Sequence, residues 1–425
     1  MTHFPPAKPN IDTTYYASQL SAYEKLIHPF KICLLDPEIL QKIQEFHDNA
    51  IFPAPSLVSP LSSLYFSSKK AQFCKLTLQQ FQKATEMLKN TKPLSMDLAS
   101  VLCSLFLCHR KQLDQMHYDS SAPIYFLDLC SSPGMKLCVA SLLFRELTQL
   151  RFVAVDISKD RLILTKKMFK LWNKDSSIRL MRHDGTLFVG GAFERSHKWE
   201  PNTLVWEGGA WYQDWIGMQR QKKGTRTGMV KDAAKKDGTP HGDSLQPRKK
   251  RKLNTTKRSC TPELHPSGSA MEQRARENPT HYDFVMIDAE CTTDGSIKHV
   301  FQYMQKYDKT VEDFLQERCN EDQVRETATL QKKLLHNGYK LLKPGGYLLY
   351  STCSLMRDQN EDVVSWLLGQ YPNSAKLVDP FQHSVLADAK QDIVYEDGKL
   401  KHTLRFNPQS TGTNGLFVAK IFKSR

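Results

Sequence analysis

Several features that would place a protein in a membrane or outside the cell are missing from these 425 residues. No apolar run approaches the roughly 18 to 20 residues needed to cross a bilayer, and the opening stretch MTHFPPAKPNIDTTYY lacks the apolar core of a signal peptide. The ten cysteines form no dense framework, which favours free thiols in a reducing compartment. There is no internal repeat. We therefore expect no membrane association, and we predict no metal site.

The positive charge is concentrated in one segment. Residues 218–258 contain fourteen Lys or Arg and three Asp, a net charge of +11, whereas the whole chain carries +14. This segment is too poor in apolar residues to bury a core, so we predict a disordered basic insertion over about 195–280. Its run PRKKRKLN, Pro247 to Asn254, is typical of a nuclear import signal, and such clusters also bind nucleic acid. We expect an import receptor as a partner and a nuclear location, including the nucleolus; alternatively, the run is a solvated loop that no receptor binds.

The chain divides into an N-terminal and a larger C-terminal part. Residues 1–115 have mostly helical spacing, as in LTLQQFQKATEMLKN (76–90) and DLASVLCSLFLCHRKQL (97–113). From residue 124, apolar strands alternate with helices, which is typical of a parallel sheet covered on both faces. We predict strands at 124–128, 151–156, 178–183, 283–288 and 346–352, helices at 135–148, 159–173, 323–342 and 360–370, and a closing antiparallel hairpin within 403–423.

An aspartate ends each of four successive predicted strands: Asp128, Asp156, Asp184 and Asp288. At the carboxyl edge of a parallel sheet such residues can bind a nucleoside cofactor, with Asp156 accepting the ribose hydroxyls and Asp184 meeting an adenine amino group. The turn CSSPGMK after the first strand offers backbone N–H groups, and Gly134 lets a ligand approach the backbone closely. NAD is disfavoured because the Gly-x-Gly-x-x-Gly fingerprint is absent. Alternatively, the aspartates only cap the following helices.

Two cysteines follow predicted strands, Cys291 in MIDAECTTDG and Cys353 in YLLYSTCSLM. Such thiols suit methyl transfer onto a pyrimidine, because carbon C5 becomes nucleophilic only after a thiolate has added to C6. Asp288 can absorb charge near N3, and the second thiol can assist release of the product. The attacking thiol needs a nearby positive charge or a helix N-terminus, since free thiols titrate near ~8.5. Other cysteines amid apolar or helical residues are interpreted as buried fillers: Cys103, Cys108, Cys130 and Cys138.

Four ordered motifs resemble the Nol/Nop/Sun family of S-adenosylmethionine-dependent RNA cytosine-5 methyltransferases. DLCSSPGMK is similar to that family's Asp-x-Cys-Ala-x-Pro-Gly-x-Lys cofactor loop, and IDAECTTDGS is similar to its Asp-Ala-Pro-Cys motif. Residues 331–364 resemble its helix, Lys-Pro-Gly-Gly turn and Thr-Cys-Ser run, and residues 404–423 resemble its closing hairpin. The resemblance covers about 120–190 and 280–425.

The resemblance implies an α/β fold: a seven-stranded, mostly parallel, Rossmann-like methyltransferase sheet over residues 116–425, interrupted by the insertion and preceded by the helical extension at 1–115. It implies methyl transfer from S-adenosylmethionine to cytosine C5 in rRNA or tRNA by a monomer, on a base that is unstacked. In this reaction Cys353 is the nucleophile, Cys291 assists release, and Asp288 contacts cofactor and base. The other implied cofactor-binding residues are Cys130, Ser131, Ser132, Pro133, Gly134, Met135, Lys136, Asp156, Arg161 and Asp184.

The loop around Cys291 departs from the family pattern. Glu290 stands where that family has Pro, and Thr292 and Thr293 stand where it has Ser-Gly. Because proline constrains the backbone, we expect a loop of different shape. We also expect the neighbouring carboxylate to raise the pKa of Cys291 by like-charge repulsion.

Two other functions remain open from the sequence. A DNA cytosine-5 methyltransferase would use the same chemistry, with Cys291 as its nucleophile. A non-catalytic RNA-binding assembly factor that has kept the fold would bind RNA without turnover, and the altered Cys291 loop motivates this alternative.

Overall fold

We describe a computed structural model of the chain. It describes residues 30–35, 56–57, 72–77, 94–107, 124–143, 150–172, 177–189, 204–207, 281–388 and 390–425. All of them belong to one compact unit, formed by residues 1–211 and 280–425. The predicted import signal at 247–254 lies outside the described residues, as does most of the predicted insertion.

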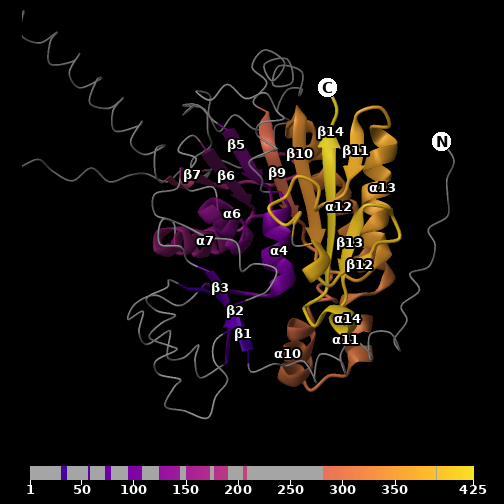
Figure 1. Cartoon of the computed structure of the whole chain (residues 1–425). Helices are drawn as coiled ribbons and strands as arrows, with labels where there is room; N and C mark the ends of the chain where they lie inside the picture. Colours follow the sequence, from indigo (N-terminus) through magenta and orange to yellow (C-terminus); the bar gives the residue numbers. More distant parts are fainter. Residues whose placement is uncertain are drawn as a thin grey trace, which may run out of the picture. The chain divides into compact units, whose positions relative to one another are not determined.

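A mostly parallel sheet organises this unit (Figure 1). Its strands run in the order β12-β13-β14-β10-β9-β5-β6-β7-β8, and β11 pairs with β14. Strands β10, β9, β5, β6 and β7 are parallel to their neighbours in this series, whereas β14, β13 and β8 pair antiparallel. The strand bounds are β5 Ile124–Asp128, β6 Leu150–Asp156, β7 Ile178–Arg182, β8 Leu204–Glu207, β9 Tyr282–Asp288, β10 Leu342–Thr352, β11 Ala375–Val378, β12 Glu396–Asp397, β13 Thr403–Phe406 and β14 Leu416–Lys423.

The five predicted parallel strands and the closing hairpin are confirmed, with ends that differ by a few residues. Seven strands, from β7 to β13 along the sheet, form the predicted Rossmann-like core, and the structure adds the short strands β8, β11 and β12. These have four, four and two residues, which is too short for a pattern to be visible in the sequence. Strand β8 lies inside the segment predicted to be a disordered insertion, so that prediction is wrong for residues 204–207.

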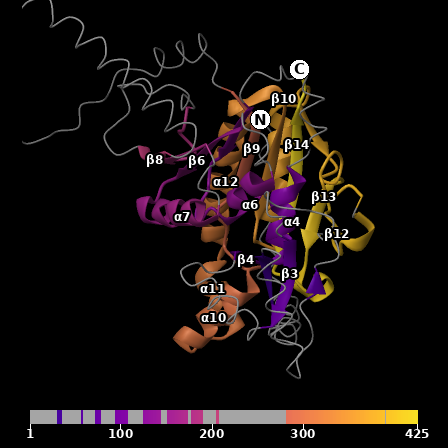
Figure 2. The ribbon, with the colours of Figure 1, turned by 60° about the vertical axis from the view of Figure 1, so that its left-hand side comes forward.

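Helices cover both faces of the sheet (Figure 2). Neighbouring residues of one strand belong to different hydrophobic clusters: Phe126 packs with α4, α6 and α7, and Leu127 packs with α12 and α13. Both faces are therefore buried, which explains the continuous apolar runs of these strands. The helix bounds are α4 Leu98–Phe106, α6 Met135–Leu143, α7 Lys159–Trp172, α10 Ile297–Tyr307, α11 Val311–Arg318, α12 Glu321–Leu341, α13 Glu361–Gln370 and α14 Pro408–Thr411.

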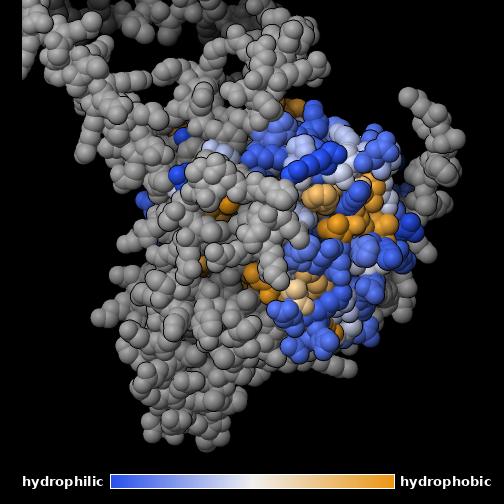
Figure 3. All heavy atoms as spheres, turned by 45° about the horizontal axis from the view of Figure 1, so that its top comes forward, coloured by the Kyte–Doolittle hydropathy of each residue, from blue (hydrophilic) through white to orange (hydrophobic). Residues whose placement is uncertain are grey.

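The predicted helices are confirmed at α6, α7, α12 and α13, whereas α10 and α11 were not predicted. In the described part of the chain, no helix has both the length and the apolar character that a membrane crossing requires. Figure 3 shows a mostly hydrophilic surface over the described residues of the face it presents, with apolar residues gathered in a few patches.

The N-terminal region differs from its prediction. Strands β2 (Ser56–Leu57), β3 (Gln72–Thr77), β1 (Phe30–Leu35) and β4 (Leu94–Met96) form a four-stranded sheet in that order. The prediction of a mostly helical region is therefore wrong for the described residues before position 97. Leu76, placed in a helix by its spacing, pairs with Lys31 of β1, because pairing with a distant strand overrides local periodicity. The buried helix predicted within 97–113 is confirmed as α4, which Asp97 caps by accepting the Ala99 N–H.

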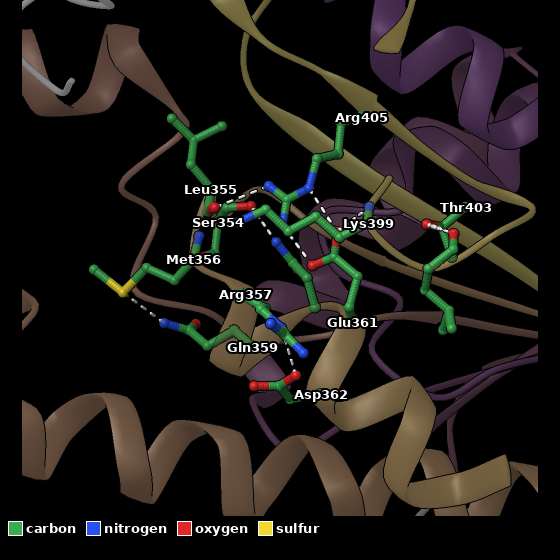
Figure 4. Close-up of polar contacts among 12 residues, drawn as sticks. Ser354, Leu355, Met356, Arg357, Gln359, Glu361, Asp362, Lys399, Thr403 and Arg405 are labelled. Carbon is green, nitrogen blue, oxygen red and sulfur yellow. Dashed lines mark hydrogen bonds and ion pairs between the residues drawn. The ribbon is translucent and has the colours of Figure 1, made fainter. Parts of the chain in front are cut away.

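A buried ion pair joins α13 to β13 (Figure 4). The Arg405 guanidinium donates to both carboxylate oxygens of Glu361, at 2.8 and 2.5 Å. The two side chains are only 12% and 2% exposed. Arg405 also donates to the carbonyl of Leu355, 2.8 Å away, and so fixes the loop that follows β10.

We predict that Arg405→Met lowers the free energy of unfolding by about 3–5 kcal/mol, because it leaves the Glu361 carboxylate buried without its cation. Urea denaturation followed by circular dichroism measures the change. Arg325→Met is the matched control, since the Arg325–Asp322 pair is 65% and 75% exposed, and we expect a change within about 0.5 kcal/mol there. Equal effects of the two substitutions would contradict the prediction.

Candidate active site

The carboxyl ends of β5, β6, β9 and β10 meet at one edge of the sheet, because parallel neighbours end on the same side. The loops after these strands carry the sequence-predicted residues. Backbone hydrogen bonds continue the sheet into the loops: Ala289 N donates to Ser351 O at 2.9 Å, and Ser131 N donates to Val155 O at 3.0 Å. The predicted acids and thiols are thus brought to one edge.

Asp156 fixes the turn after β5. One carboxylate oxygen accepts the Ser132 N–H at 3.2 Å, and the other accepts the Ser158 N–H at 2.9 Å. Arg161 donates to the Ser132 carbonyl at 2.6 Å and lies 3.9 Å from the Asp156 carboxylate. Arg161 therefore lies beside Asp156 as expected. Asp156 itself is only 4% exposed, and its carboxylate already binds two backbone N–H groups.

The backbone conformation and the close packing at position 134 both require glycine. Its φ is +86°, and a Cβ atom at this position would lie 2.5 Å from Cγ2 of Thr165 on α7. Close approach of a ligand was the predicted reason for this glycine, and the packing of the turn against α7 is a second reason. The turn also contains a buried polar atom: among the described residues, the Ser131 hydroxyl oxygen has no hydrogen-bond partner.

The four strand-end aspartates have different roles in the structure. Asp128 is buried and accepts the Cys130 N–H at 3.2 Å, and burial raises its pKa well above the usual range for a carboxyl. Asp184 accepts from both the N–H and the hydroxyl of Thr186 at 2.8 Å, inside its own turn. These contacts of Asp128 and Asp184 lie within their own turns and do not cap a helix, whereas Asp156 and Asp288 bridge separate segments.

Two exposed apolar side chains, which were not predicted as site residues, lie close in sequence to Asp156 and Asp184. Ile157 follows Asp156 directly and is 64% exposed, and Leu187 follows the Asp184 turn and is 66% exposed. The backbone brings their segments together, since His183 N donates to Asp156 O at 3.1 Å. The sequence signal that could have found them is an apolar residue just beyond an acid that ends a strand.

Lys136 and Asp288 form a short, partly buried ion pair at this edge of the sheet. Lys136 Nζ lies 2.6 Å from one oxygen of Asp288, and the Ser351 hydroxyl donates to the other oxygen at 2.8 Å. Burial alone would lower the pKa of Lys136, but the negative charge of Asp288 outweighs it, so the pKa is raised and the ammonium stays charged. This residue was predicted only as part of the cofactor loop, and its amine is directed to Asp288.

The side chains of Cys291 and Cys353 contact each other at this edge of the sheet. Both are free thiols, and their sulfur atoms lie 2.9 Å apart. Two hydrogen bonds tie their loops together: Gly295 N donates to Cys353 O at 2.9 Å, and Leu355 N donates to an Asp294 carboxylate oxygen at 2.8 Å. Two cysteines separated by 62 positions are therefore presented as one thiol pair.

The pKa of Cys291 is raised well above the usual thiol range, first by its hydrogen bond with Cys353 and then by burial. Cys291 therefore keeps its proton near neutral pH. The raised pKa of Cys291 was predicted, but its attribution to Glu290 is wrong: Glu290 is exposed, and the neighbouring thiol makes the largest contribution.

Of the four cysteines interpreted as fillers, Cys103 and Cys138 are fully buried, which confirms that interpretation. Burial raises the pKa of Cys103 to about 11 and that of Cys138 to about 12. Cys130 is partly exposed at the site edge, and Cys108 lies outside the described residues.

Part of the chain is similar in sequence to known methyltransferases, and its fold is similar to that of a solved structure. A family model described as 16S rRNA methyltransferase RsmB/F matches residues 244–422. The tRNA (cytosine(49)-C(5))-methyltransferase of Pyrococcus abyssi is 32% identical over 145 residues, which are 34% of this chain and 42% of that protein. The ribosomal RNA small subunit methyltransferase F of Pectobacterium carotovorum is 28% identical over 146 residues, which are 34% of this chain and 26% of that protein. The chain spans less than half the length of these curated relatives.

Among solved structures, the crystal structure of the protein PH0851 is similar in fold. The alignment covers 99% of this chain and 70% of that chain, with 17% sequence identity and a TM-score of 0.51. This likeness concerns the fold alone and agrees with the α/β sheet described above.

We predict that Cys353→Ala lowers the pKa of Cys291, because the hydrogen bond that contributes most to raising it is lost. A lower pKa means more thiolate at a given pH, so iodoacetamide should alkylate Cys291 faster, and the pH of half-maximal rate should fall. Mass spectrometry of the peptide that contains Cys291 measures this rate. Cys353→Ser, which retains a hydrogen-bonding hydroxyl, should give a smaller shift. An unchanged or upward-shifted profile in Cys353→Ala would refute the assignment.

Proposed function

We propose that the protein methylates cytosine C5 in RNA with S-adenosylmethionine as methyl donor, because residues 244–422 match the family model of the RsmB/F methyltransferases. The observation that carries this proposal is the thiol pair: Cys291 and Cys353 lie 2.9 Å apart, on the loops after two adjacent parallel strands. One of the two relatives is named as a tRNA cytosine-C5 methyltransferase and the other as a methyltransferase of small-subunit ribosomal RNA. Both names support RNA as the substrate class.

The residues of the edge fit a nucleoside cofactor. The Ser131 hydroxyl is buried without a partner among the described residues, so it is available to a ligand in the turn after β5. In this proposal Asp156, which already accepts two backbone N–H groups, also accepts ribose hydroxyls. The exposed side chains of Ile157 and Leu187 can contact the base, whose amino group meets Asp184. When bound, S-adenosylmethionine supplies an electrophilic methyl group. The cofactor roles of Cys130 to Lys136 and of Arg161 remain part of this proposal.

Cys353 starts the reaction by adding its thiolate sulfur to C6 of the cytosine. This addition places negative charge on the ring, and the Lys136 ammonium, which is paired with the Asp288 carboxylate, provides the positive charge that stabilises it near N3. The Lys136 ammonium also attracts a negative charge on Cys353, since the Cys353 thiolate contributes to the raised pKa of Lys136. Carbon C5 then acts as the nucleophile toward the methyl group.

Cys291 acts after methyl transfer. While Cys353 is free, its hydrogen bond keeps Cys291 protonated. Once the Cys353 sulfur is bonded to C6, that hydrogen bond is lost, and the pKa of Cys291 falls. Cys291 then loses its thiol proton to solvent, and its thiolate accepts the proton that leaves C5. The electron pair of that C–H bond forms the C5–C6 double bond, and the Cys353 sulfur departs from C6 with the electrons of the broken C–S bond.

The target cytosine must leave its base stack to reach the thiol pair, which favours a loop or bulge of rRNA or tRNA. We further propose nuclear import through residues 247–254 and function as a monomer. A fusion of this segment to a fluorescent protein, compared with Lys250→Ala combined with Arg251→Ala, tests the import proposal.

We predict that the wild-type protein forms 5-methylcytidine in total RNA incubated with methyl-labelled S-adenosylmethionine. Cys353→Ala should lower the yield by at least about a thousandfold, since the covalent route is lost. Cys291→Ala should form the covalent protein–RNA adduct and release it slowly. Cys138→Ala, which removes a buried thiol of α6, is the control and should retain activity.

The alternatives give different results in the same assay. Label on DNA, with the adduct lost in Cys291→Ala and kept in Cys353→Ala, would support the DNA enzyme. Intact cofactor binding with no label on either nucleic acid would support the non-catalytic assembly factor.

We predict that Gly134→Ala weakens S-adenosylmethionine binding by at least about tenfold. The added Cβ would lie 2.5 Å from Thr165 at a φ of +86°, so the turn must move away from its position. Isothermal calorimetry measures the affinity. Gly369→Ala is the matched control, because nothing lies within 4 Å of a Cβ there, and an equal loss in both variants would contradict the argument.

A further inference from the structure

Two buried glutamines hold the peptide groups on either side of Cys291. Gln331 on α12 donates its side-chain N–H to the carbonyl oxygen of Glu290 at 2.8 Å. Gln359, in the 3₁₀ helix Arg357–Gln359 after β10, accepts the backbone N–H of Thr292 at 3.0 Å. The two amides also contact each other, with Gln331 donating to Gln359 at 3.4 Å. Both glutamines are 0% exposed, so water does not compete for these bonds.

The same contacts continue to the loop of Cys353. Gln359 donates to the Thr292 hydroxyl at 2.8 Å, and that hydroxyl donates to one carboxylate oxygen of Asp294. The other oxygen of Asp294 accepts the Leu355 N–H. Figure 4 shows Gln359 beside Met356, whose sulfur accepts a further contact at 3.6 Å. The position of Cys291 relative to Cys353 is thus set by side chains from both loops and from α12.

The sequence explains why this loop depends on side-chain anchors. Glu290 has no ring to restrict its backbone, and its own side chain is exposed. The carbonyl of this residue and the N–H of Thr292 are the two backbone groups that flank Cys291, and each is fixed by one glutamine. Fixing both limits rotation of the Cys291 peptide units, and therefore the direction of its sulfur.

We propose that Gln331 and Gln359 are positioning residues that hold the Cys291 sulfur against Cys353 and so set the rate of adduct release. The proposal rests on the proposed function for its kinetic part, whereas its geometric part concerns the thiol pair alone. Neither glutamine touches the reacting atoms, and each acts through Cys291. Displacement of a reacting group by about 1 Å can lower a rate by about 100-fold.

The kinetic test uses Gln331→Met and Gln359→Met, which keep side-chain length and remove the hydrogen bonds. With RNA and S-adenosylmethionine, we expect turnover to fall about 10- to 100-fold while the denaturation-stable protein–RNA adduct accumulates. Tyr339→Phe is the control, because Tyr339 lies on the same helix as Gln331 and the substitution removes one hydrogen bond, to Ser374. Its turnover should stay within about twofold of the wild-type value. A parallel fall in adduct formation and turnover would overturn the proposal, because it indicates general loss of structure.

A double-mutant comparison separates positioning from simple packing. In a Cys291→Ala background, Gln331→Met and Gln359→Met should cause no further slowing of release, since the residue through which they act is gone. Equal fold-changes in the two backgrounds would overturn the proposal. If a methionine variant does not fold, Thr292→Val tests the same contacts, because it removes the hydroxyl that receives the Gln359 bond.

The geometric test requires no RNA. Dibromobimane bridges two thiols that lie close together and becomes fluorescent when it does so. We expect the wild-type protein to be bridged between Cys291 and Cys353, with the rate about tenfold lower in both glutamine variants and unchanged in Tyr339→Phe. Equal bridging in all variants would overturn the positioning role. Normal bridging behaviour together with no methylation by the wild-type protein would instead reject the proposed function and leave the geometric inference standing.

Discussion

The parallel pairing of β9 with β10 is the constraint on which the site depends. Its register places Asp288 opposite Ser351, and the Ala289 N–H then bonds to the Ser351 carbonyl. Because both strands end at this level, their loops leave the sheet side by side, and Cys291 meets Cys353 although 62 positions separate them. A slip by one residue would turn Asp288 toward the opposite face of the sheet and remove it from Lys136. The chemistry of the edge is therefore a consequence of strand register.

The register is in turn fixed by burial of both faces. Val285 and Ile287 face the cluster formed with α12 and α13, and Phe284 and Met286 face the cluster formed with α4 and α6. A shift would place each set against the wrong helices, at a cost in packing on both sides. The same helix α12 carries Gln331 to the Cys291 loop, so the element that buries the sheet also anchors the site.

The sequence predicted those parts of the fold that are specified locally. Strands buried on both faces have continuous apolar runs, and the acids and thiols follow them directly, so strand ends and candidate residues were recognisable. The partners of these residues were not, because Gln331 lies on a helix and Gln359 in a short turn, and no local pattern indicates which backbone group a buried amide will bind. Strand β3 was missed for a related reason: its pairing with β1 is a distant contact, whereas periodicity measures only neighbours. The pKa of Cys291 was predicted in direction but attributed to Glu290, since sequence adjacency does not indicate that a thiol 62 positions away is the closer group.

The electrostatics of the edge distinguish the two thiols. Sulfur atoms 2.9 Å apart accommodate one negative charge far more easily than two, because a second charge would be strongly repelled. Cys291 retains its proton as a consequence of its contact with Cys353, and the positive charge of Lys136 interacts with Cys353. Because Cys291 retains its proton, its contact with Cys353 supports the proposed roles of Cys353 as the nucleophile and of Cys291 as the thiol that acts after the adduct has formed.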